Sequence, residues 1–108
     1  MKFHTNLYIG ASIKNPGKVK RQLKRKFGRF DIYIIILAHG DDQLEFFRSI
    51  YLKQKSLRQL YLKQGKPLHV VGIAGSHDEA CGIVEDITAD CLAKTGTADL
   101  KQFLLSSE

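Results

Sequence analysis

The stretch Asp31-Ile32-Tyr33-Ile34-Ile35-Ile36-Leu37-Ala38-His39-Gly40-Asp41-Asp42 decides the fold class of this chain. Its first eight residues show no polar alternation after Asp31, and β-branched isoleucines fit the pleated surface of a strand. A strand that has no face to show to water is covered on both sides, as the strands of parallel sheets are. We therefore expect this strand at the centre of a sheet, with its polar exit at one edge.

Two other stretches predict strands, residues 7–10 and residues 68–74. A helix is predicted between the first two strands, because Asn15-Pro16 combines a side-chain N-cap with a proline at the first helical position. Its apolar stripe consists of Val19, Leu23 and Phe27, and Gly28 suits the C-terminal end.

Three helices are predicted after the central strand. One begins at Asp41 or Asp42 and runs towards Gly65, with Leu44, Phe47, Ile50 and Tyr51 on one face. The next begins at a capping box formed by Ser76 and Glu79 and ends near Lys94-Thr95-Gly96. Its buried face consists of Ala80, Ile83, Val84, Ile87 and Cys91. A short last helix, capped by Thr97, carries Leu100, Phe103 and Leu104.

The resulting order, β-α-β-α-β-α-α, predicts a single α/β domain spanning residues 1–108. A three-layer sandwich is expected, in which a small three-stranded parallel sheet with right-handed crossovers is covered by two helices on each face. Such a small sheet leaves exposed edges, so a homodimer is also expected.

Composition is that of an average globular protein, with 44% apolar and 26% charged residues in 108. There is no apolar run of the roughly 18 residues that a membrane span needs, and the start of the chain lacks the apolar stretch of a secretory signal. Cys81 and Cys91 fall in one predicted helix about 15 Å apart, too far for a disulfide. Free thiols suit a reducing compartment, so we expect a cytoplasmic protein without membrane contact.

Charge is distributed unevenly along the chain. Residues 1–30 hold nine of the basic residues and no acid, whereas residues 73–108 hold seven acids and two lysines. The basic residues gather on the first helix, opposite its apolar stripe, and the candidate partner-binding set is Lys18, Lys20, Arg21, Lys24 and Arg25. These positive charges suit an acidic protein surface, including that of a second copy, or a nucleic-acid phosphate backbone. No aromatic residue interleaves with them along the sequence, although such interleaving would be expected of a nucleic-acid binder.

A metal site is the sharpest chemical hypothesis. In a parallel sheet the carboxyl ends of the strands share one edge, so His39, Asp42 and His77 are expected to meet there as two imidazoles and a carboxylate. That set suits zinc, with Asp41 as the base for a bound water.

The same stretch, Leu37-Ala38-His39-Gly40-Asp41-Asp42-Gln43, resembles the strand-end motif Ala-His-Pro-Asp-Asp-Glu of the LmbE/PIG-L-like zinc-dependent deacetylases. The resemblance implies His39 and Asp42 as metal ligands and Asp41 as the base. It covers six residues, with Gly40 in place of the proline and Gln43 in place of the glutamate, and we do not assign the chain to that family.

Two further sites are weaker hypotheses. The turn at residues 72–76 leads into a helix whose N-terminus suits an anion, but the carboxylates of Asp78 and Glu79 compete for that position. His77 and Cys81 stand one helical turn apart, where they can touch, but nearby carboxylates raise the pKa of a thiol and oppose thiolate chemistry.

The function expected from the sequence is therefore a non-enzymatic binding or regulatory module, with the basic face of the first helix for an acidic partner. One alternative is a metal-dependent hydrolase using His39, Asp41, Asp42 and His77. The other is a binder of the nucleic-acid phosphate backbone.

Overall fold

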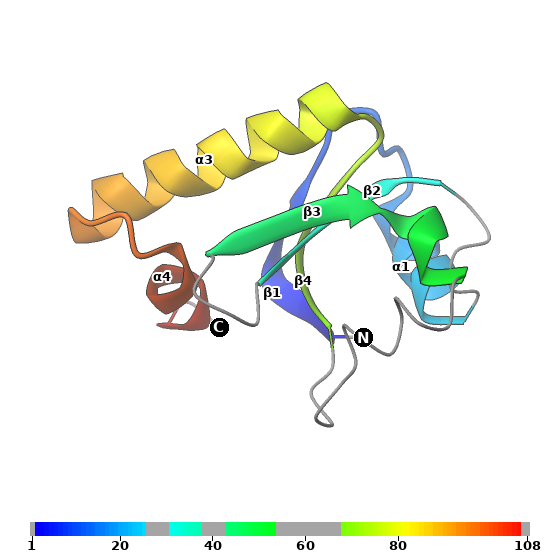
Figure 1. Cartoon of the computed structure of the whole chain (residues 1–108), viewed down its shortest axis with the longest axis horizontal. Helices are drawn as coiled ribbons and strands as arrows, with labels where there is room; N and C mark the ends of the chain where they lie inside the picture. Colours follow the sequence, from blue (N-terminus) through cyan, green and yellow to red (C-terminus); the bar gives the residue numbers. More distant parts are fainter. Residues whose placement is uncertain (1, 26–30, 38–42, 54–67, 107–108) are drawn as a thin grey trace.

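The structure, a computed structural model, describes residues 2–25, 31–37, 43–53 and 68–106 (Figure 1). The elements in chain order are β1 (Lys2–Ile9), α1 (Pro16–Arg25), β2 (Tyr33–Leu37), β3 (Leu44–Arg48), the 3₁₀ helix η1 (Ser49–Lys53), β4 (His69–Ala74), α3 (His77–Thr95) and α4 (Leu100–Ser106). The α/β class is therefore confirmed.

The predicted three-stranded parallel sheet is wrong. The described strands form one mixed sheet in the order β1-β4-β2-β3. β1 and β4 are parallel, but β2 runs antiparallel to both β3 and β4. β2 and β3 pair in hairpin register, from Tyr33 opposite Arg48 to Leu37 opposite Leu44.

The error comes from residues 44–53, predicted to begin a helix and found as β3 followed by η1. Phe46 packs against one core cluster and Phe47 against the other, so these neighbours occupy opposite faces of the sheet. Adjacent residues on a strand do so, and a strand that is apolar on both faces also satisfies a helical spacing. The predicted cap at Asp41 or Asp42, and the continuation to Gly65, lie outside the described residues.

Burial of the central strand is confirmed. The side chains of Ile34, Ile35 and Ile36 are all fully buried. Ile35 packs with α3 and α4, whereas Ile34 and Ile36 pack with Leu23 of α1 in a second cluster. Figure 1 shows α1 and the α3–α4 pair at different sides of the strands. The three-layer arrangement stays a prediction, because residues 54–67 are not described.

β1 is longer than predicted and irregular. Phe3 pairs with Val70 and Tyr8 with Gly72, so β1 takes five steps where β4 takes two. The extra residues of β1 therefore bulge away from its partner, and bulges of this kind re-aim side chains beside functional sites.

Three helix ends agree with the sequence. The Asn15 side chain accepts a hydrogen bond from the Lys18 amide at 3.1 Å, and the Ser76 hydroxyl accepts one from the Glu79 amide at 3.2 Å. Gly96 ends α3 in the left-handed conformation, φ 73°, where glycine carries no steric penalty. The predicted cap of the last helix at Thr97 is wrong, because Asp99 accepts the Gln102 amide at 3.1 Å. None of the helices in the described ranges has the length and apolar character to cross a membrane.

Candidate functional site

The strand ends expected to build a metal site do not share an edge. Tyr33, the first residue of β2, pairs with Ala74, the last of β4, so the chain beyond Leu37 leaves at the opposite end of the sheet from His77. The premise of the zinc site is therefore wrong. His39, Asp41 and Asp42 themselves lie outside the described residues. Within the ranges that are described, no cluster of three or more His, Cys, Asp or Glu side chains is arranged to hold a metal ion.

His77 lies at the start of α3 in an aromatic cluster. Its ring meets the rings of Tyr33 and Phe46 edge-on, with centroids 5.9 and 5.4 Å away. The predicted contact with Cys81 is confirmed, with 3.7 Å between Nδ1 and Sγ. The Asp78 carboxylate is 3.9 Å from the same nitrogen, at the long limit of an ion pair. The aromatic rings therefore account for the position of His77.

The carboxyl ends of β1 and β4 do meet, and Glu79 fills the space between them. Its carboxylate accepts hydrogen bonds from the Gly75 amide at 2.8 Å and from the amide and hydroxyl of Ser12 at 3.1 and 2.8 Å. The Gly75 amide, followed by the two Ser12 groups, lowers the pKa of Glu79 against the opposing effect of burial. A side chain at Gly10 would collide with this carboxylate. The Glu79 carboxylate therefore occupies the anion position that was predicted at this helix start. Glu79 was also predicted to accept a hydrogen bond from the Ser76 amide, but it accepts those of Gly75 and Ser12 instead.

The basic face of α1, defined here as Lys18, Lys20, Arg21 and Lys24, is largely solvent-facing, with Lys20 half-buried. The side chain of Arg25, predicted to join this face, lies outside the described residues. Across the described part of the chain, no carboxylate is recorded within ion-pair distance of these four side chains. Their charge is therefore available to another molecule.

An aromatic ring fixes part of this face. The ammonium groups of Lys20 and Lys24 lie 5.8 and 5.5 Å from the centroid of the Phe3 ring, within the range of cation–π contacts. Phe3 belongs to β1, and its ring also packs against the core cluster that contains Leu23. The sequence prediction that no aromatic residue accompanies these charges holds only along α1, because the ring comes from another element.

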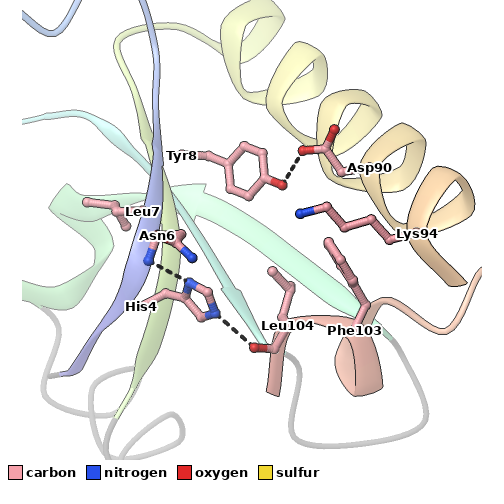
Figure 2. A pocket seen from close by; sticks show the side chains of 8 residues that line it. All are labelled: His4, Asn6, Leu7, Tyr8, Asp90, Lys94, Phe103 and Leu104. Carbon is pink, nitrogen blue, oxygen red and sulfur yellow. Dashed lines mark hydrogen bonds between the residues drawn. The ribbon is translucent and has the colours of Figure 1, made fainter. Parts of the chain in front are cut away.

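A pocket of about 410 Å³ opens on the α3–α4 side of β1 (Figure 2). Its lining combines three elements, β1, α3 and α4. The lining residues are His4, Asn6, Leu7, Tyr8, Asp90, Lys94, Phe103 and Leu104. His4, Asn6 and Tyr8 are spaced two apart in β1, the spacing that puts side chains on one face of a strand.

His4 organises the floor of this pocket. Its side chain is buried. Nδ1 accepts a hydrogen bond from the Asn6 amide at 3.1 Å, and Nε2 lies 2.8 Å from the Leu104 carbonyl oxygen. These partners require a neutral ring with its proton on Nε2, which donates to the carbonyl. The ring also stacks on that of His69 at 5.7 Å. His4 therefore joins the β1 bulge to α4.

The opposite wall is charged. The Tyr8 hydroxyl donates to Asp90 Oδ2 at 2.5 Å. Burial of the hydroxyl, and then Asp90 itself, raise the pKa of Tyr8 well above its ordinary value, so Tyr8 stays a neutral donor. Lys94, one helical turn after Asp90, places its ammonium 5.8 Å from the centroid of the Phe103 ring.

This pocket was not predicted from the sequence. The alternation of His4, Asn6 and Tyr8 was a usable signal for a strand with one polar face, but the partners on α3 and α4 come from the other end of the chain. No protein-family model matches the chain, and comparisons with curated proteins and with solved structures give no significant match.

Proposed function

We propose that this protein is a non-enzymatic binding or regulatory module that uses the basic face of α1 to hold an acidic partner. The observation that carries the proposal is the pair of lysines over Phe3, because the ring orders two flexible side chains before a partner arrives. Ordering charges in advance reduces the entropy lost on binding. The absence of acidic residues from α1 also leaves the whole face with one sign of charge.

An acidic protein surface is favoured over nucleic acid. Aromatic rings that assist nucleic-acid binding present an open face on which a base can stack. The Phe3 ring instead packs against the core cluster and lies beneath Lys20 and Lys24. Its contribution is to position two cations, which suits carboxylate partners and leaves phosphate-backbone binding as the alternative.

A homodimer and a cytoplasmic location belong to the same proposal. Among the strands that the structure describes, β1 and β3 form the two edges of the sheet, and edge strands favour pairing with another chain. Both cysteines are free thiols, the form that a reducing compartment maintains.

The test is a binding titration with poly-L-glutamate, a DNA duplex and a single-stranded RNA, each at several salt concentrations. Changing Lys18→Glu and Arg21→Glu together is expected to weaken binding of poly-L-glutamate roughly tenfold or more, because two attractions become repulsions. The matched control, Lys94→Glu with Lys101→Glu, changes the net charge equally but leaves α1 intact, and should change binding by less than about twofold.

Equal losses in the two double variants would contradict a role for the α1 face, because they would show that only net charge matters. Tighter binding of the duplex or the RNA than of poly-L-glutamate, with the same dependence on Lys18 and Arg21, would instead establish the nucleic-acid alternative. In that case the logarithm of the binding constant should fall linearly with the logarithm of the salt concentration.

A further inference from the structure

Two opposite charges on α3 are held apart. Asp90 and Lys94 stand four residues apart with the acid first, the arrangement in which helix side chains ordinarily form an ion pair. Here Asp90 instead accepts the Tyr8 hydroxyl of β1, and Lys94 lies over the Phe103 ring of α4. Among the residues that the structure describes, no ion pair of Asp90 or Lys94 is recorded.

Both charges line the pocket of about 410 Å³ beside the β1 bulge (Figure 2). The exposed side chain of Asn6 lies at the same pocket, and Leu7 and Phe103 supply apolar surface. A ligand there meets one carboxylate, one ammonium and one amide, next to an aromatic ring.

We propose that this pocket binds a small zwitterion that carries neighbouring ammonium and carboxylate groups, the class of free α-amino acids. Asp90 receives the ligand's ammonium, Lys94 its carboxylate, and Phe103 contacts an apolar side chain. The charges of Asp90 and Lys94 cancel, so a ligand with a single charge would gain one attraction and suffer one repulsion. A zwitterion gains both attractions.

The pocket volume suits this class, since small-molecule sites span about 300–1,000 Å³. The site is separate from the proposed function, because none of the residues that line the pocket belongs to the basic face of α1. Loss of one therefore leaves the other intact.

The experiment is an NMR titration of the full chain with L-leucine, N-acetyl-L-leucine and L-leucinamide. L-Leucine is expected to shift the amide signals of Asn6 and Lys94 with a dissociation constant of about 1 mM or lower. Each blocked derivative lacks one charge and should bind at least about tenfold more weakly.

Variants separate the site from general charge effects. Lys94→Met keeps the aliphatic stem over Phe103 and should weaken L-leucine binding about tenfold, whereas Lys18→Met, on α1, should leave it unchanged. The dispersion of the amide spectrum shows that each variant is folded.

Three results would overturn the proposal. The first is the absence of shifts at Asn6 and Lys94 up to about 10 mM L-leucine, ten times the expected constant. The second is a blocked derivative that binds as tightly as L-leucine. The third is an equal loss of affinity in Lys94→Met and Lys18→Met.

Discussion

Ile35→Ala is expected to lower the free energy of unfolding by about 3–4 kcal/mol, the largest effect of any single substitution considered for this protein. Ile35 is fully buried at the middle of β2, opposite Phe46 of β3 and Gly72 of β4. Its side chain packs in the cluster formed with α3 and α4. Truncation removes buried methyl groups and leaves a cavity that a sheet with partners on both sides cannot close.

Urea unfolding of the wild-type and variant proteins measures this loss. The matched control is Ile9→Ala, at the end of β1, where the side chain is 43% exposed. That change should cost less than about 1 kcal/mol. If the two variants lost the same stability, β2 would not lie at the centre of the sheet.

His4→Ala is expected to cost about 2–3 kcal/mol, because truncation deprives two backbone groups of a hydrogen-bond partner at once. The Leu104 carbonyl loses the Nε2 proton, and the Asn6 amide loses Nδ1. The bond to Leu104 is buried, and losing a buried hydrogen bond costs more than an exposed one, whereas the exposed Asn6 amide turns to water. The loss should concentrate in α4, since His4 joins that helix to β1 from a hundred residues away.

Hydrogen exchange of backbone amides in α4, together with urea unfolding, tests this expectation. The control is His77→Ala, which removes an exposed imidazole whose ring contacts, Tyr33 and Phe46, lie outside α4. It should leave the exchange of α4 unchanged and cost less than about 1 kcal/mol. Unaltered protection of α4 in His4→Ala would contradict the role given to His4.

The local features of the fold were predictable from the sequence. Consecutive β-branched isoleucines favoured a covered strand. Asn15 and Ser76 cap the starts of their helices, and Gly96 caps the end of α3, through groups within four residues. Strand direction was not predictable in the same way. Phe46 and Phe47 satisfied a helical pattern because both faces of β3 are apolar, and replacing that helix by a strand turned a parallel crossover into a hairpin.

The same distinction between local and long-range features applies to the candidate sites. The spacing of the lysines on α1 predicted a basic face. The aromatic ring beneath them belongs to Phe3, whose position depends on the pairing of β1 with β4 and could not be predicted from α1 alone. The pocket depends on longer connections still, from His4 to Leu104 and from Tyr8 to Asp90. No periodicity within one segment reports such contacts.

The direction of β2 relative to β4 is the point on which the mixed sheet and the rejection of the zinc premise depend. Paired residues of antiparallel strands approach to about 4.5 Å between Cα atoms where they are not hydrogen-bonded, which brings their α-protons face to face. Nuclear Overhauser spectra should therefore show α-proton contacts between β2 and β4 at alternate pairs and in opposite chain order, either at Tyr33–Ala74 and Ile35–Gly72 or at Ile34–Ile73. Contacts linking Leu37 to Ala74 would mean that the strands run in parallel and would contradict this account.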